Sequence, residues 1–450
     1  MKTFNIVDYG AKFCDKLQTE AIQKAIDECF LAGGGRVVIP CGIYLTGSLR
    51  IRSGVELCLE AGAILKGSRN PEDYLAFIDD TVEPVTIEPI GNTPATGRSA
   101  VATSRWCNGL IRALDAENIS VIGEKGSYID GENCYDPEGE EKYRGPHGMS
   151  FWRCKNIHLE GYTFLNSSNW CHAIFQSQNI TVRNVTVYGG HDGFDVRTCD
   201  NVLVEDCDFR TGDDGIAGFD NNDVIVRNCI LNTACHPVRF GGNNVLIENC
   251  RSGESEFGFR NNLSPEKKAM GALTGPECRH ESNASFSYYC DHRAVLRKPA
   301  ENIVIRNCHF GLAKEMVRLE FDGLHRWCCN RSLKSITFEN CSFENLLRPG
   351  MLWGDENEKF TCHFKNVKIT ARKDYAHEAL FVAANFDKII FEDCVVEGYA
   401  DPTIMVATDD KVEFIRSTPI KIQKSTQEEC LDAHPWGVVP EDRKNGRRFR

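Results

Sequence analysis

A short phrase that recurs about every 22 residues restricts the fold of this 450-residue chain more than any other feature. The phrase begins with Asn or Asp, continues with alternating aliphatic positions, and ends in an acidic or amide residue that Cys often follows. Copies begin at Asn156, Asn179, Asn201, Asp223 and Asn244, in steps of 23, 22, 22 and 21 residues, and then at Asn302, Ser335 and Lys388 with insertions between them.

This period indicates a β-solenoid. Short alternating strands at a spacing in the low twenties, with Asn, Asp and Gly at the corners and no helical pattern between copies, are typical of one solenoid coil. A leucine-rich repeat has a similar length but needs Leu at fixed offsets, where this chain has Val, Ile and Phe. We therefore predict an all-β, single-domain right-handed parallel β-helix.

An amphipathic helix is predicted before the regular coils. Residues Thr19 to Leu31 carry apolar side chains at helical spacing, Thr19 suits an N-cap, and Gly33 to Gly35 end the helix. An open solenoid end exposes its core, so this helix is a natural cap. The predicted parts are an N-terminal strand and capping helix (1–35), the β-helix (36–422) with loop insertions near 79–105 and 265–298, and a C-terminal tail (423–450). The segment Tyr135–His147 is also predicted to be a loop, beside the binding groove.

The repeat explains the high number of cysteines, 22 in the chain. Equivalent residues of successive coils stack about 4.8 Å apart, so one phrase position forms an internal ladder. Cys behaves there as a small buried apolar residue. The predicted ladder contains Cys207, Cys229, Cys250, Cys308, Cys341 and Cys394.

Charge and composition exclude several classes of function. The net charge of -12 argues against nucleic acid or a membrane surface as a partner, because both need a basic face. The basic run Arg443–Arg450 is interpreted as a solvated terminus. The chain enters strand-like sequence at once without a signal-like apolar segment, so we predict a cytoplasmic protein with reduced cysteines. No oligomeric state is predicted.

A cluster of acidic residues follows the coil period. Asp192 and Asp214 are 22 residues apart, and His236 follows Asp214 by another 22. These side chains are therefore expected to stack on one edge of the solenoid, with Asp213 beside Asp214. Carboxylates packed so closely repel each other, so at least one is expected to have a raised pKa.

Such a cluster suits glycoside hydrolysis. That reaction needs one carboxylic acid to protonate the leaving oxygen and one carboxylate to activate water or to attack carbon. Two alternatives to catalysis remain. In one, the aspartates only accept hydrogen bonds within turns, and in the other they bind calcium. The predicted catalytic residues are Asp192, Asp213, Asp214 and His236, and neither a metal nor another cofactor is predicted.

Arginines are expected beside the acids. Strand alternation turns Arg239 outward from Val238 and Phe240, and Arg260 lies 24 residues beyond His236. An arginine there would hold a sugar carboxylate with two hydrogen bonds. The predicted substrate-binding set is His191, Asp195, Arg239, Arg260 and Asn262.

From Phe4 to about Asn262 the chain resembles glycoside hydrolase family 28, the polygalacturonases. The resemblance rests on the opening FNIVDYGAK, on GGGRVVIPCGIYLTGSLRIRSGVELCLEAGAILKGS, on NSSNWCHAIFQSQNITVRNVTV and on the aspartate motifs. It implies that Asp213 is the general acid and that Asp192 and Asp214 orient the attacking water in an inverting hydrolysis.

Three family motifs are altered. Gly190-His191-Asp192 keeps only the aspartate of an Asn-Thr-Asp motif, and Cys235-His236-Pro237 keeps only the histidine of a Gly-His-Gly motif. Arg260-Asn261-Asn262 keeps the arginine of an Arg-x-Lys motif that holds the galacturonate carboxylate, but loses the lysine.

The predicted function is therefore exo-acting, inverting hydrolysis of pectin-type oligosaccharides, derived from galacturonan or rhamnogalacturonan. The substrate is expected to be acidic, with a neutral sugar as the alternative. A uronate lyase or epimerase on the same scaffold and a non-catalytic carbohydrate-binding solenoid are the competing hypotheses.

Overall fold

The structure is a computed structural model that describes residues 1–74, 108–140, 143–258, 280–290, 296–320, 333–373 and 379–434. Its chain divides into two compact units, residues 1–213 with 256–279 and residues 214–255 with 280–450. The predicted insertion near 79–105 lies almost wholly outside the described residues, as does most of the one near 265–298. Arg260 and Asn262 also lie outside them.

The first unit begins with a capped end. It contains β1 (Thr3–Asn5), the 3-10 helix η1 (Ile6–Tyr9) and α1 (Thr19–Leu31). The bounds of α1 match the predicted range, but the N-cap prediction is wrong, because Gln18 is the N-cap and Thr19 is the first helical residue. The helix buries Ile22, Ala25, Ile26 and Cys29 and contacts β1 and β2 (Gly35–Ile39). The predicted capping helix is therefore confirmed, and it covers apolar residues of the first coils.

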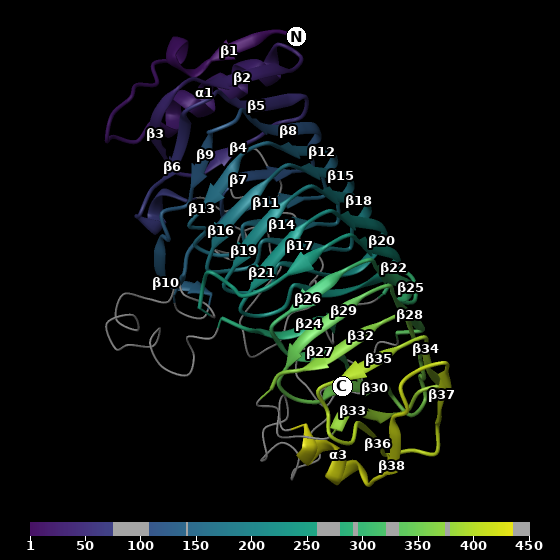
Figure 1. Ribbon diagram of the computed structural model, residues 1–450. Coiled ribbons are helices and arrows are strands. Elements are labelled where there is room, and N and C mark those ends of the chain that lie inside the picture. The colour runs from purple at the N-terminus through teal and green to yellow at the C-terminus, as the bar shows by residue number, and fades with distance from the viewer. Residues whose placement is uncertain are drawn as a thin grey trace. The chain divides into compact units, whose positions relative to one another are not determined.

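Parallel strands then stack coil on coil through the first unit (Figure 1). The remaining elements are β3 (Gly42–Thr46), β4 (Leu49–Arg50), β5 (Val55–Leu59), β6 (Ala63–Gly67), η2 (Pro71–Asp73), β7 (Gly109–Leu114), β8 (Glu117–Gly123), β9 (Tyr128–Asp130), β10 (Tyr135–Glu140), β11 (His147–Trp152), β12 (Lys155–Glu160), β13 (Thr163–Leu165), β14 (His172–Phe175), β15 (Gln178–Arg183), β16 (Thr186–Gly189), β17 (Phe194–Arg197), β18 (Asp200–Glu205) and β19 (Asp208–Thr211). Each coil contributes strands to three parallel stacks, such as β12–β15–β18, β11–β14–β17 and β13–β16–β19. In the segment predicted as a loop, Tyr135–His147, the structure has the strand β10.

The second unit repeats the same coil. Its elements are β20 (Ile216–Arg227), β21 (Ile230–Thr233), β22 (Val238–Glu248), β23 (Arg251–Ser252), β24 (Ser282–Tyr288), β25 (Glu301–Arg306), β26 (His309–Gly311), β27 (Ala313–Glu320), β28 (Ser335–Glu339), β29 (Ser342–Leu346), β30 (Gly350–Trp353), β31 (Thr361–Lys365), β32 (Lys368–Ala371), β33 (Ala379–Ala384), β34 (Lys388–Glu392), β35 (Val395–Glu397), β36 (Thr403–Val406), β37 (Lys411–Ile415), β38 (Lys421–Lys424) and α3 (Gln427–Ala433). The strands pair in parallel, for example β25–β28–β31–β34–β37. The predicted parallel β-helix is confirmed.

The Asn that opens each phrase has a structural reason. Asn156, Asn179 and Asn201 adopt left-handed backbone angles with φ of 56°, 57° and 56°, which Asn tolerates better than most residues. The Nδ2 of Asn179 donates to Oδ1 of Asn156 at 2.9 Å, and the Nδ2 of Asn201 donates to Oδ1 of Asn179 at 3.0 Å. An amide ladder therefore runs along this corner and fixes the coil register.

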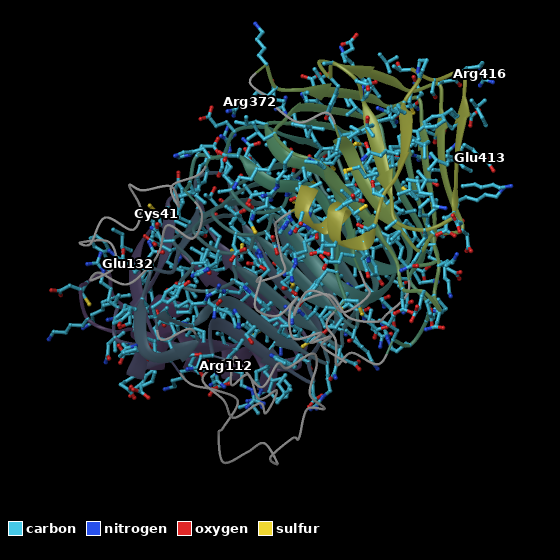
Figure 2. All side chains as sticks on the ribbon, turned by 90° about the horizontal axis from the view of Figure 1, so that it is seen from below. Cys41, Arg112, Glu132, Arg372, Glu413 and Arg416 are labelled. Carbon is cyan, nitrogen blue, oxygen red and sulfur yellow. The ribbon has the colours of Figure 1, made fainter. Side chains whose placement is uncertain are left out.

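Apolar side chains fill the inside of each coil. In the first unit Ile157, Ile180 and Val202 are buried at equivalent positions of β12, β15 and β18. All six cysteines of the predicted ladder are buried as well, namely Cys207 in the first unit and Cys229, Cys250, Cys308, Cys341 and Cys394 in the second. Charged side chains project outward, as Figure 2 shows for Glu413 and Arg416 of the second unit.

The C-terminal segment 423–450, predicted as a tail, begins with ordered structure. The helix α3 starts at a capping box, in which the Thr426 hydroxyl accepts from the Glu429 amide and the Glu429 carboxylate accepts from the Thr426 amide. Its Cys430 and Leu431 pack with Met351 and Trp353 of β30. Among the described residues, no helix is long and apolar enough to cross a membrane.

Candidate active site

Two of the predicted catalytic carboxylates belong to the first unit, in turns beside its strands. Asp192 precedes β17 and Asp213 follows β19, and they are only 4% and 5% exposed. A close approach of successive turns positions them: the Gly212 amide donates to the Gly189 carbonyl at 2.9 Å. A Cβ on Gly212 would lie 2.7 Å from the Gly190 oxygen, so a larger residue would push these turns apart.

Arg144 is the neighbour of Asp213 that sequence reasoning missed. One Nη atom lies 3.6 Å from the Asp213 carboxylate, and the other donates to Oδ1 of Asn169 at 3.3 Å. Its side chain is 2% exposed, so its charge acts in a buried environment. The residue lies in the segment predicted as a groove-wall loop, where a single arginine gives no specific signal.

His191 and His172 support the turn that carries Asp192. The His191 ring stacks on Tyr143, with 6.1 Å between centroids, and is buried. His172 accepts from the Tyr162 hydroxyl at Nε2 and donates from Nδ1 to the Gly193 carbonyl, both at 2.8 Å. Burial lowers the pKa of His172 to about 4, so this histidine is neutral and holds the turn through its Nδ1 proton.

Asp195 lies beneath this turn in a buried ion pair. Its side chain is inaccessible, and its two oxygens accept from Nε and Nη2 of Arg197 at 2.8 and 2.9 Å. The Arg197 guanidinium lies 4.4 Å from the centroid of the Trp170 ring. These contacts are structural, and the predicted substrate-binding role of Asp195 stays a prediction.

The second unit carries Asp214 with two partners, His236 and Arg239. One oxygen of Asp214 lies 2.7 Å from Nδ1 of His236, and the other accepts from Arg239 at 3.2 Å. Burial alone would raise the pKa of Asp214, but His236 and Arg239 together hold it well below its usual range. Asp214 is therefore an ionised carboxylate at neutral pH. The raised pKa expected in the cluster is not found at this residue.

His236 presents its other nitrogen without a partner. Because the ionised Asp214 accepts at Nδ1, that nitrogen carries a proton, while Nε2 has no hydrogen-bond partner among the described residues. The Gly215 amide donates to the His236 carbonyl at 2.8 Å and fixes the backbone.

Arg239 lies beside Asp214, as predicted from strand alternation. Its guanidinium carbon is 3.6 Å from the centroid of the buried Tyr289 ring, and its side chain is 20% exposed. Stacking on Tyr289 fixes the plane of the guanidinium. Sequence reasoning missed this aromatic support, because Tyr289 follows Arg239 by 50 residues, which matches no coil period.

A metal is a weaker interpretation of the same residues. Ligand atoms of Asp214, Cys235 and His236 lie within 4.8 Å of one another. However, the Nδ1 that would face a metal is protonated and donates to Asp214. The set fits a hydrogen-bonded carboxylate better than a metal centre.

The sequence profile of glycosyl hydrolases family 28 matches residues 79–261. A probable polygalacturonase of Vitis vinifera is 28% identical over 227 residues, which cover 47% of this chain and 43% of the relative. An exo-poly-alpha-D-galacturonosidase of Dickeya chrysanthemi is 28% identical over 253 residues, which cover 48% of this chain and 41% of the relative. The chain thus spans less than half the length of these two relatives.

A solved structure extends the likeness in fold to nearly the whole chain. The family 28 exopolygalacturonase of Yersinia enterocolitica superposes with a TM-score of 0.60 at 18% identity, covering 95% of this chain and 79% of that one. At this identity the likeness concerns the fold alone.

Proposed function

The chain is related to glycosyl hydrolases family 28 through residues 79–261, and on that premise we propose that it hydrolyses glycosidic bonds of pectin-type oligosaccharides. The predicted resemblance is confirmed. The observation that carries the proposal is the environment of Asp214, an ionised carboxylate held by His236 and Arg239. A carboxylate that is ionised at neutral pH can accept a hydrogen bond from the attacking water, as the base of an inverting hydrolysis must.

The proposed mechanism divides the work among three aspartates. Asp213 gives a proton to the glycosidic oxygen as the bond to the anomeric carbon breaks. Asp192 and Asp214 orient a water molecule, Asp214 takes its proton, and the oxygen attacks the anomeric carbon from the opposite face, which inverts the configuration. The support for joining the three residues is their 22-residue spacing and the adjacency of Asp213 and Asp214 in the chain.

The substrate is proposed to be an acidic pectin fragment attacked from its end. Arg239 stacks on Tyr289 and presents a partly exposed guanidinium, which suits a sugar carboxylate. Arg260 remains a second candidate for this role, and Asn262, which replaces the family lysine, leaves a neutral sugar as the alternative. The exo mode is part of the proposal because the matched protein of Dickeya chrysanthemi is named an exo-poly-alpha-D-galacturonosidase.

The decisive experiment uses galacturonan and rhamnogalacturonan oligosaccharides with the wild type and Asp213→Asn. Mass spectrometry should show products that gain one water per cleaved bond with the wild type only, and proton NMR should show the inverted anomer first. Asp223→Asn is the matched control, because Asp223 is exposed and accepts from Asn244 in a corner ladder that an Asn also fits. Equal turnover by wild type and Asp213→Asn would contradict the proposal.

The same samples separate the competing hypotheses. A lyase would give an unsaturated product that absorbs in the near ultraviolet and gains no water. An epimerase would change the NMR spectrum of the sugar without cleaving it. Binding without turnover, unchanged in Asp213→Asn, would identify a carbohydrate-binding solenoid.

A further inference from the structure

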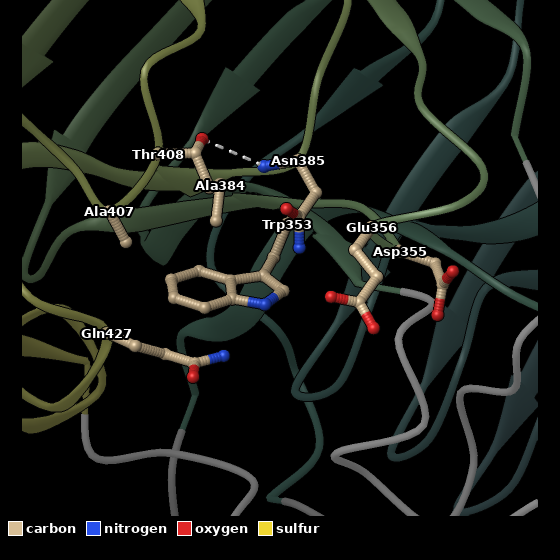
Figure 3. A pocket seen from close by; sticks show the side chains of 8 residues that line it. All are labelled: Trp353, Asp355, Glu356, Ala384, Asn385, Ala407, Thr408 and Gln427. Atoms are coloured by element: carbon tan, nitrogen blue, oxygen red, sulfur yellow. Dashed lines mark hydrogen bonds between the residues drawn. The ribbon is translucent and has the colours of Figure 1, made fainter.

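A small polar pocket lies in the second unit at the end of β30, and it shares no residue with the acidic cluster. Its volume is about 190 Å³. Pockets that enclose drug-sized ligands measure roughly 300–1,000 Å³, so this one suits a single small unit. The lining residues, shown in Figure 3, are Trp353, Asp355, Glu356, Ala384, Asn385, Ala407, Thr408 and Gln427.

Trp353 carries the argument for a ligand. The side chain is fully buried and packs with Met351, Val382 and Leu431, yet its Nε1 has no hydrogen-bond partner in the described part of the chain. Figure 3 shows this indole nitrogen on the side of the ring that faces Glu356. A buried N–H without an acceptor is destabilising, so an acceptor oxygen supplied from the pocket would remove that cost.

The other polar groups around the pocket supply acceptors and donors. Asn385 is held in place by two hydrogen bonds. Its side-chain Nδ2 donates to the Gly354 carbonyl at 3.1 Å, and its backbone N–H donates to the Thr408 hydroxyl at 3.2 Å. Asp355 and Glu356 add carboxylates, Asp355 buried and Glu356 exposed. The exposed Gln427, the first residue of α3, adds a side-chain amide.

The chemistry of this set favours hydroxyl groups. A hydroxyl can accept from the Trp353 indole and donate to a carboxylate, whereas a bare cation cannot accept from an N–H. The carboxylates of Asp355 and Glu356, which line the pocket, disfavour an anionic sugar such as a uronate. Ala384 and Ala407 occupy little volume, which leaves room for the ligand.

We propose that this pocket binds one neutral, hydroxyl-rich sugar residue. The site goes beyond the proposed hydrolysis, whose substrate is acidic, and it would hold a neutral sugar of a branched oligosaccharide or a released neutral product.

The test titrates the full chain with galactose, rhamnose and galacturonate and follows saturation-transfer NMR signals of each sugar. A neutral sugar should bind the wild type more tightly than galacturonate. Trp353→Phe keeps an aromatic ring but removes the N–H, and it should weaken neutral-sugar binding about three- to tenfold, the loss of one hydrogen bond. Glu356→Gln removes the charge of an exposed side chain. It should therefore reduce the preference of the pocket for neutral sugars over galacturonate.

Matched controls keep the outcome clear. Trp152→Phe also removes a buried indole, one that donates to Ser150 at 3.1 Å, and it should leave sugar binding unchanged. Gln427 lies at the exposed edge of the pocket. The variant Gln427→Ala therefore tests the pocket even if Trp353→Phe fails to fold.

Equal binding of neutral sugars by the wild type, Trp353→Phe and Gln427→Ala, or no binding of any of the three sugars by the wild type, would overturn the proposal. The hydrolysis assay is independent, so neutral-sugar binding without turnover would refute only the proposed function.

Discussion

At the scale of single residues, the surroundings of Asp214 explain how one carboxylate of a crowded cluster stays ionised. His236 and Arg239 each form a hydrogen bond with one carboxylate oxygen of Asp214, and the Tyr289 ring stacks against the Arg239 guanidinium. Closely spaced aspartates differ in function when their partners differ. Asp213 has a different neighbour, Arg144, at 3.6 Å.

Replacing the proposed base should nearly abolish turnover. We expect Asp214→Asn to lower kcat by roughly 10²–10⁴-fold, because an amide cannot take the proton of water. The measurement is steady-state hydrolysis of an oligosaccharide, with Asp223→Asn as control. A variant with at least half of the wild-type kcat would show that Asp214 is not the base.

Removing a cationic partner should shift the pH dependence of hydrolysis. Since Arg239 helps to lower the pKa of Asp214, Arg239→Gln should raise that pKa, and the base would become protonated at a higher pH. The acidic limb of kcat/KM against pH should therefore move upward. An unchanged limb would mean that Arg239 acts only in binding.

At the scale of elements, a buried ion cluster fastens α3 to the last coils of the second unit. Glu315 of β27 is fully buried and contacts Arg318 at 2.5 Å, Arg348 at 2.6 Å and His434, the residue after α3, at 3.0 Å. Burial alone would raise the pKa of Glu315, but Arg318, Arg348 and His434 hold it well below its usual range. The sequence shows no periodic signal for this cluster, because Arg348 and His434 lie outside the strands and far from Glu315 in sequence.

Neutralising Glu315 should destabilise the fold. We expect Glu315→Gln to cost about 3–5 kcal/mol in the free energy of unfolding, because it leaves buried cations without their counterion. Glu413→Gln, which breaks the exposed pair with Lys388, should cost only about 0–1 kcal/mol. Denaturant unfolding of both variants makes the comparison, and equal losses would contradict it.

The same cluster predicts acid sensitivity. Its contribution is present above the unfolded-state pKa of Glu315 and is lost as the pH falls through the lower folded-state pKa. The wild type should therefore lose more stability on acidification than Glu315→Gln. Unfolding curves from pH 7 downward measure the difference.

At the scale of the whole molecule, the stacked coils bury most of the described cysteines. Burial raises the pKa of Cys171 and Cys362 well above the ordinary value, so neither is a reactive thiolate at neutral pH. Cys41 is exposed, and Figure 2 labels it near the outside of the first unit. This arrangement suits the reduced cysteines predicted from the sequence, whereas the cytoplasmic location stays a prediction.

Alkylation of the native protein should follow burial. Iodoacetamide should modify Cys41 early, while Cys171 and Cys362 react only after unfolding, and peptide mass spectrometry identifies the sites. A reducing agent should leave the unfolding temperature unchanged. A clear fall in that temperature would show stabilising disulfides and argue against the reduced state.

The sequence by itself determined the features that repeat. Because each coil has the same length, a period of about 22 residues already implies parallel stacking, a corner asparagine ladder and buried cysteines. It also places Asp192, Asp214 and His236 in register, and the helix Thr19–Leu31 follows from a local apolar pattern. The Thr426–Glu429 capping box is an equally local pattern, although residues 423–450 were predicted as a tail without a helix.

Only the tertiary structure decided the contacts that do not repeat. Arg144 beside Asp213 and Tyr289 beside Arg239 join side chains whose separations in sequence follow no coil period. The unpartnered indole of Trp353 likewise depends on packing by α3 and neighbouring coils. Periodicity reports which face of a strand a residue occupies, whereas charge, burial and partner identity depend on what the folded chain brings beside it.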